Sequence, residues 1–461
     1  MPKTLSLSLL ITLILFTGCA QKSEFMQQDI LQGQGMYRDA VVQADKSMDH
    51  DDFEANNNLL WNLNLGYAYY MLQNDENSTR TFNDAERLMK IHREQILASD
   101  ISQTLSSILV NDNTRPYIGK EYDGIMINTY KALNYLDKQD FDGARVEFNR
   151  AIDRQRRAKE FFSKSIEKQS KAIAQEEANQ RQKGGSMNVD RSLDNTDAVL
   201  NRSYPELNAY KTYPQFINPL TNYLAGLFAL YNGDVSKGEF LLKEAKAMMP
   251  DSKAVQEDYK TAEAIYSNHQ RSQESLVWVI FENGQAPLLK EMRVDFPAWI
   301  FSNRLAYVSL ALPKLQPRQK AFDYIDINGQ ESHFLCSMER VIQTEFKNEY
   351  PSIVGRALLS AMTKTAIQYQ ANQQNEWAGL AAAIYQIAST SADTRIWSAL
   401  PKEVQIVRMQ RPENGQLILK QPNNTIIKEI SLPDTQQTLV YVRIPTNTAK
   451  ASIRVMPLGE Q

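Results

Sequence analysis

Residues 61–85 read WNLNLGYAYYMLQNDENSTRTFNDA, and the spacing of small residues in this stretch recurs twice later in the chain. Successive offsets of three, nine, four and three positions separate Gly66, Tyr69, Ser78, Phe82 and Ala85. The same offsets separate Ala132, Tyr135, Ala144, Phe148 and Ala151, and again Gly226, Ala229, Gly238, Leu242 and Ala245. Two antiparallel helices approach closely only where side chains are small. The spacing therefore predicts a helix hairpin at each of the three places.

Polar turn residues fall between the two helices of each unit, at Asn74-Asp75, Gln139-Asp140 and Asn232-Gly233-Asp234. With Leu65 before the first set and Pro250 after the third, the units resemble tetratricopeptide repeats. Three features depart from that family: Trp61 lies one position away from the family's tryptophan, Lys131 replaces an apolar residue, and the units are not contiguous. The resemblance implies an interrupted repeat array. A generic helical bundle is the alternative.

The residue composition and the hydrophobic pattern of the chain change near residue 271. Residues 31–270 read as helix, rich in Ala, Leu, Glu, Gln and Lys. Short runs with valine, isoleucine and aromatic residues follow and predict strands. These runs are Ser275–Glu282, Lys290–Phe296, Ala306–Pro313, Val404–Arg411, Gln416–Lys420, Thr425–Leu432, Thr438–Pro445 and Ser452–Met456. With a helical block at Ser337–Thr390, the fold class is α+β and multidomain: a helical repeat domain at 31–270, then an α+β domain at 271–461.

A long charged stretch, Ala151–Gln182, follows the second hairpin. It predicts a helix that projects past the array, with Phe161, Phe162, Ile166 and Ile173 on one stripe. Lys183-Gly184-Gly185-Ser186 is expected to end it, and residues 187–203 are expected to form a mobile loop. The helix is either solvated or half of a partner-binding coiled hairpin.

The first residues have the layout of a secretory signal peptide. Lys3 precedes an apolar run, Leu5–Phe16, which is too short to span a bilayer, and Thr17-Gly18-Cys19 follows. A cysteine at this place resembles the lipobox of bacterial lipoproteins. The resemblance implies removal of residues 1–18, lipidation of Cys19 (the palmitate-type acylation of that class) and a lipidated tether at 19–30. The alternative is an ordinary signal peptide with an incidental cysteine.

The residues after Cys19 bear on which membrane holds the lipid. Lipoproteins with aspartate directly after the cysteine tend to stay at the inner membrane, whereas this chain has Ala20, Gln21 and Lys22. The analogy implies the periplasmic face of the outer membrane in a Gram-negative bacterium, with the inner membrane still open. The mature chain then keeps one cysteine, Cys336, so no internal disulfide is expected.

The composition and the motifs of the chain give little indication of a catalytic or binding site. The formal net charge of −3 gives no footprint for nucleic acid. We find no phosphate-binding glycine loop, no Gly-x-Ser-x-Gly elbow and no His-Glu-x-x-His helix. His333 and Cys336 form the best candidate for a nucleophile and a base, but a buried structural thiol and a surface histidine explain them better. We therefore expect no catalytic residue, metal, cofactor or small-molecule substrate.

One further segment, Ala392–Pro401, contains Asp393, Arg395 and Trp397, which we expect to form a buried corner with an Asp393–Arg395 pair. Together with Phe281–Gly284 and Gly355–Leu358, it resembles a family of uncharacterised proteobacterial lipoproteins that have a leader, a helical-repeat half and a C-terminal half. That resemblance implies no activity.

These observations predict a non-enzymatic lipoprotein whose helical repeats form a concave surface for a protein partner. The partner is expected in the cell envelope, as a scaffolded, activated or assembled complex, for which cell-wall synthesis is one candidate. The alternative is an envelope enzyme with its site in the C-terminal α+β domain. Loss of function in Cys336→Ala or His333→Ala, with normal folding, would favour the enzyme.

Overall fold

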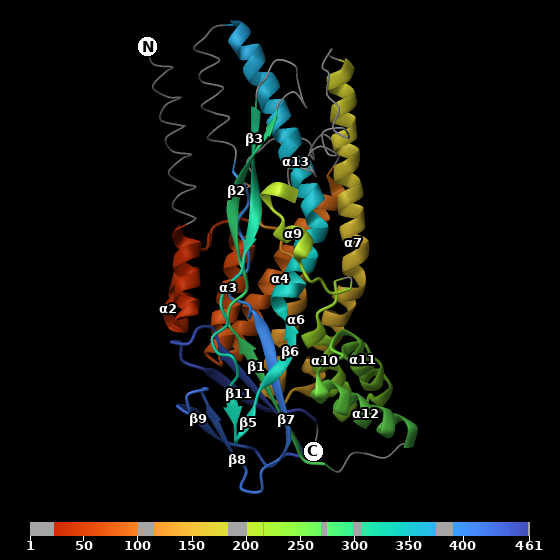
Figure 1. The fold of residues 1–461 in the computed structure, drawn as a ribbon, viewed down its shortest axis with the longest axis vertical. Helices are drawn as coiled ribbons and strands as arrows, with labels where there is room; N and C mark the ends of the chain where they lie inside the picture. The colour runs from red at the N-terminus through yellow and green to blue at the C-terminus, as the bar shows by residue number, and fades with distance from the viewer. Residues whose placement is uncertain are drawn as a thin grey trace.

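A computed structural model describes residues 23–99, 115–182, 201–214, 216–268, 274–297, 307–374 and 391–459. Helices come first and strands gather in the second half (Figure 1), which confirms the α+β fold class. In the described part of the chain, no helix is both long and apolar enough to cross a membrane. The leader, Cys19 and most of the expected loop at 187–203 lie outside the described residues.

The three expected helix hairpins are present. The first pairs α3 (Asn58–Met71) with α4 (Asp75–Ala98), the second α6 (Glu121–Asp137) with α7 (Phe141–Gln182), and the third α10 (Pro219–Tyr231) with α11 (Val235–Met248). α2 (Tyr37–Ser47) packs against α3, and α12 (Lys253–Asn268) against α11. The short α9 (Glu206–Ala209) lies between the second and third hairpins.

The three hairpins turn in the same way. Gln73, Gln139 and Gly233 hold the same place in their turns, with positive φ angles of 59°, 58° and 87°. The next residue, Asn74, Asp140 or Asp234, accepts a hydrogen bond from the backbone N–H three positions later. This side-chain cap satisfies an N–H group that would otherwise lack a partner at the start of the second helix.

Small residues permit the close approach that the spacing predicted. A Cβ atom on Gly66 would lie 2.7 Å from the Phe82 ring, and one on Gly226 would lie 2.9 Å from Leu242. Phe82 and Leu242 are the large residues at the fourth place of the repeated pattern. Each fills the space that the opposite glycine leaves, which explains why the pattern alternates small and large residues.

The strands form three sheets. The order of the five-stranded sheet is β11 (Ser452–Pro457), β10 (Gln437–Ile444), β1 (Leu276–Asn283), β7 (Glu403–Gln410) and β6 (His333–Ser337). Only its β1–β10 pair is parallel. The order of the four-stranded sheet is β5 (Gln330–Glu331), β4 (Asp326–Ile327), β8 (Gln416–Lys420) and β9 (Ile426–Ser431). β2 (Leu288–Pro297) and β3 (Tyr307–Gln316) form a separate antiparallel ribbon.

The five-stranded sheet lies between the hairpins and the four-stranded sheet. Along β1, Leu276, Trp278 and Ile280 belong to the core shared with the hairpins, while Val277 and Phe281 belong to the core shared with the small sheet. Every residue of β1 is buried. This two-sided burial explains why the strand reads as a continuous apolar run. One hydrophobic core therefore joins the two halves that the sequence separates at residue 271.

Three elements extend beyond this layered body toward the same end, at the top of Figure 1. They are the β2–β3 ribbon, α13 (Met338–Gln374) and the C-terminal part of α7, and we call them the arm. α13 packs against β3 and α7. The projection of α7 confirms the helix expected at Ala151–Gln182. Phe161 and Phe162 are half-buried, whereas the side chains of Ile166 and Ile173 are outside the description.

The structure describes part of the segment expected as a tether at 19–30. Residues 23–33 form a helix, and Gln28, Leu31 and Gln32 are buried. Asp29 in this helix pairs with Arg318 at 2.8 Å. The segment is helical because it has a partner surface on the folded body. That surface comes from both halves of the chain: Phe25 stacks on Trp61 of α3, Gln32 donates to the Asn64 carbonyl, and Asp29 meets Arg318.

Candidate functional site

A buried carboxylate joins the first two hairpins to the sheet. Glu282 on β1 is fully buried and accepts hydrogen bonds from Tyr130 of α6 at 2.8 Å and Tyr441 of β10 at 2.7 Å. The Arg443 guanidinium lies 3.7 Å from Glu282 and donates to the Tyr67 hydroxyl of α3 at 2.7 Å. Burial raises the pKa of Glu282, and Arg443 opposes that shift. Helices and strands thus share one charge-paired contact. We call Glu282, Arg443 and the three tyrosines that bind them the weld.

Two further pairs extend the weld. Asp258 of α12, fully buried, accepts from Tyr223 of α10, from the Trp278 indole at 2.9 Å and from Arg408 of β7 at 2.7 Å. Arg454 of β11 pairs with Asp75 at 2.6 Å and with Asp137 at 2.8 Å, at the turns of the first two hairpins. Each hairpin therefore has its own polar connection to the sheet.

The expected corner at Ala392–Pro401 belongs to the same interface. Asp393 and Arg395 pair at 2.7 Å, as predicted, and Arg395 also donates to Asn57 at 2.9 Å. Trp397 is fully buried, with its ring edge-on to Tyr67 and Tyr130. The corner therefore packs on the helical half and does more than end the helical block before a strand.

Phe281–Gly284 also contributes to this interface. Asn283 accepts from the backbone N–H groups of Ala321 and Phe322, at 2.9 Å and 3.2 Å. Gly284 has a φ of +72°, and a Cβ there would lie 2.8 Å from the Lys320 backbone. The residues of this stretch are thus fixed by packing and turn geometry.

The inner face of the hairpins is closed. Residues 58–68 of α3, 121–134 of α6 and 219–230 of α10 are all buried. The partners that cover them include Glu282, Trp278 and Trp397 of the same chain. The expectation that these helices form a concave surface for a protein partner is therefore wrong, because the chain's own sheet occupies that surface.

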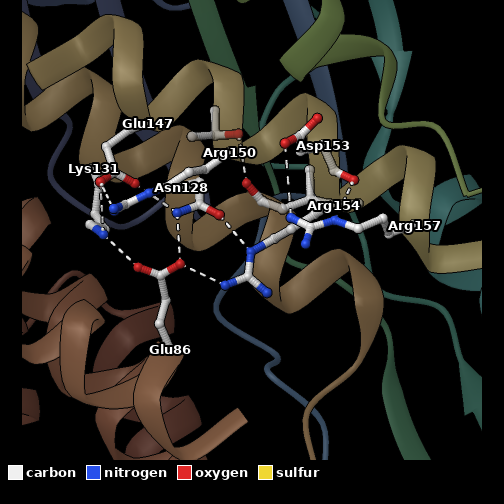
Figure 2. A network of polar contacts seen from close by, with 10 residues as sticks. Glu86, Asn128, Lys131, Glu147, Arg150, Asp153, Arg154 and Arg157 are labelled. Carbon is white, nitrogen blue, oxygen red and sulfur yellow. Dashed lines mark hydrogen bonds and ion pairs between the residues drawn. The ribbon is translucent and has the colours of Figure 1, made fainter. Parts of the chain in front are cut away.

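Lys131, the departure from the repeat pattern, has a physical explanation. Its ammonium group is buried between Glu86 of α4 at 2.5 Å and Glu147 of α7 at 3.0 Å (Figure 2). Arg154 pairs with the other oxygen of Glu86 at 2.6 Å. Burial would raise the pKa of Glu86, but these two cations outweigh it and hold the pKa at about 2. The network joins hairpins one and two by charge.

The candidate pair His333 and Cys336 is not arranged as a reactive site. Cys336 is buried, as expected, and burial raises the pKa of its thiol. His333 is exposed on β6. Because nucleophilic attack needs the thiolate, this buried thiol is a core residue. Within the described ranges, no group of three or more His, Cys, Asp or Glu residues could hold a metal ion.

A cavity of about 360 Å³ lies at the base of the arm. Its walls come from the end of α4, the loop and first turn at 115–122, α7, the β2–β3 ribbon and α13. The volume is within the range of small-molecule sites. The apolar part of the lining includes Phe161, Phe162, Leu289, Leu315, Ile342, Phe346 and Ile353. This is the candidate functional site.

Charged groups join α13 to the α6 end of the cavity. Glu345 accepts from the backbone N–H of Glu121 at 2.8 Å and of Tyr122 at 3.2 Å, at the start of α6. Burial raises the pKa of Glu345 to about 8, and the charge of Glu121 adds to the shift. One helical turn further on, Glu349 pairs with Lys120 at 2.5 Å. These contacts fix the base of the arm.

Two buried acceptors in the wall have no hydrogen-bond partner. His92 is 2% exposed; its Nδ1 lies 3.1 Å from the Tyr117 carbonyl, while its Nε2 is unpartnered. Glu121 is 4% exposed; its Oε1 pairs with Arg93 at 2.6 Å, while its Oε2 is unpartnered. Sequence reasoning identified neither residue. An isolated histidine and a glutamate at a helix start give no local sign of a shared cavity.

Comparison of the chain with protein-family models, with curated proteins and with solved structures finds no match.

Proposed function

We propose that this chain is a lipid-anchored scaffold of the cell envelope that binds a protein partner through its arm. Cys19 would carry the lipid, at the periplasmic face of the outer membrane, and the three hairpins would be tetratricopeptide-like repeats from an array whose inner face is no longer open. The role is non-enzymatic. One observation carries the proposal: three elements from distant parts of the sequence project together from a charge-paired body.

The polar contacts that hold the arm to the body support this proposal. Fixing a binding surface on a welded body reduces the ordering cost of association. Salt bridges and hydrogen bonds hold the base of the arm, including Lys120–Glu349 and the Tyr213 N–H donating to Thr344 at 2.9 Å. With the inner face of the hairpins covered, the arm offers a projecting surface to a partner in the described part of the chain. The enzyme alternative has no support from His333 and Cys336.

Site-specific crosslinking in the native envelope tests the partner. A photoreactive residue replaces Lys164 of α7 or Arg293 of β2, two exposed arm positions, and in the control it replaces Lys428 of β9, exposed on the opposite part of the body. The proposal expects one discrete crosslinked protein from both arm positions and none from Lys428. Crosslinks from Lys428 alone, or from none of the three positions, would overturn it.

The anchor has a separate test. Cys19→Ala is expected to release the protein from membranes washed in high salt, because two or three acyl chains anchor stably and none remain in the variant. The mass of the wild-type N-terminal peptide should show the acyl groups. A Cys19→Ala protein that stays on the membrane, with no acyl mass on the wild type, rejects the anchor and leaves the crosslinking test intact.

A further inference from the structure

The two unpartnered acceptors differ from other unpartnered atoms in the core. Trp397 Nε1 also lacks a partner, but that side chain is surrounded by the rings of Tyr67, Phe82 and Tyr130 and lines no described cavity. His92 and Glu121 both line the cavity at the base of the arm. In the described part of the chain, both of these unpartnered acceptors therefore belong to residues that line a cavity.

The hydrogen-bonding state of His92 is set by its neighbours. Because Nδ1 faces the Tyr117 carbonyl oxygen at 3.1 Å, Nδ1 carries the proton and Nε2 of the neutral ring is an acceptor. Burial lowers the pKa of His92, which keeps the ring neutral near pH 7. A carboxylate oxygen such as Oε2 of Glu121 also accepts. The wall therefore requires a donor from whatever binds there.

The charges of the lining select a neutral donor over a charged one. Five cationic residues line the cavity, namely Arg115, Lys120, Lys168, Arg356 and Arg395, against four acidic ones, Glu121, Glu345, Glu349 and Asp393. Because Glu345 has a pKa of about 8, it is largely uncharged at pH 7, so cationic groups are in excess and a cationic ligand is disfavoured. An anionic head group would meet the two unpartnered acceptors and is disfavoured for that reason.

We propose that the cavity binds a neutral amphiphile with an apolar body and a hydroxyl donor, whose hydroxyl group supplies the hydrogen bond that His92 Nε2 or Glu121 Oε2 lacks. The apolar body would contact Phe162, Leu315, Ile342 and Phe346. The proposal goes beyond the scaffold role, does not depend on it, and revises the expectation that the protein binds no small molecule. Because α13 and β2–β3 form part of the walls, an occupant would also stabilise the base of the arm.

Calorimetric titration with four probes of similar chain length tests the head-group chemistry. The probes are 1-octanol, methyl octyl ether, octanoate and octylammonium, titrated at pH 7 into the full chain carrying Cys19→Ala, so that no attached lipid competes. We expect 1-octanol to bind about tenfold more tightly than the ether, because only the alcohol supplies the missing donor. Equal affinity of alcohol and ether, tightest binding of either charged probe, or no binding would overturn the proposal.

Two variants test the location. His92→Phe keeps a ring but removes the acceptor, and it should lower the preference for alcohol over ether; the matched control His333→Phe, an exposed histidine, should leave it unchanged. Ile353→Trp fills the cavity without changing a polar group and should abolish binding of all four probes. Circular dichroism confirms that each variant is folded. Unchanged binding in folded Ile353→Trp would overturn the location, whatever the crosslinking of the arm shows.

Discussion

The weld and the cavity at the base of the arm are both interfaces between the helical half and the second half, yet they are built differently. In the weld, Arg443 and Glu282 are buried as an ion pair surrounded by aromatic rings. At the cavity, Glu345 is buried with a raised pKa, and His92, a lining residue, has a buried nitrogen without a hydrogen-bond partner. The difference teaches that one interface of this chain buries an ion pair among aromatic rings, whereas the other leaves a cavity between the elements that form it.

The largest expected effect tests the weld. Arg443→Met leaves Glu282 buried without its counter-charge, and we expect the free energy of unfolding to fall by about 3–5 kcal/mol. Urea unfolding followed by circular dichroism measures it. Adding Glu282→Gln to Arg443→Met should recover part of the loss. A fall below about 1 kcal/mol would contradict a large stabilising role for the Arg443–Glu282 pair.

The second prediction tests the cavity wall through pH. The pKa of Glu345 is raised in the folded state, so its proton stabilises the fold at low pH, and this contribution is lost as the pH rises from about 4.5 toward 8. Glu345→Gln should remove that loss. We expect the variant to gain on the order of 2–4 kcal/mol relative to wild type between pH 4.5 and pH 8. Parallel pH profiles of the two proteins would contradict this.

A smaller effect is expected at the charge network of Figure 2. This network lies away from the weld and from the cavity, so it provides a comparison for buried ion pairs elsewhere in the molecule. Lys131→Met leaves Glu86 paired with Arg154, so we expect a loss of about 1–3 kcal/mol at pH 7. Since the pKa of Glu86 is held at about 2, its stabilising contribution disappears as the pH falls from about 4.5 to 2. The variant should therefore lose less stability than the wild type over this pH range. Thermal unfolding at a series of pH values measures the difference.

The smallest effect is expected at the hairpin turns, far from the weld and the cavity. Asn74→Ala, Asp140→Ala and Asp234→Ala each remove one side-chain cap, and we expect losses of about 0.5–2 kcal/mol in each. Thermal unfolding midpoints compare the three. Similar losses of stability in the three variants would support equivalent repeat units. A large loss in one variant and no loss in the other two would indicate a local role for that one residue.

Features that depend on residues close together in the sequence could be predicted. The strand at Gln416–Lys420 matches β8 residue for residue, because alternation and flanking turn residues are local signals. The Asp393–Arg395 pair was expected for the same reason, since the two residues are two positions apart. The cavity was not predicted. His92, Lys120, Phe161 and Glu345 come from four elements, and nothing in the sequence around any one of them indicates the others.

The sequence by itself determined the three hairpins, their turns, the burial of Cys336 and the strands of the second half other than β4, β5 and β6, because propensity, spacing and alternation act over a few residues. Only the tertiary structure decided that the inner face of the hairpins is closed and that a cavity remains at the base of the arm. The reason is physical: Glu282 meets Tyr130 across 152 positions of the chain, and Lys120 meets Glu349 across 229. Such contacts depend on how whole elements pack, which local residue patterns do not specify.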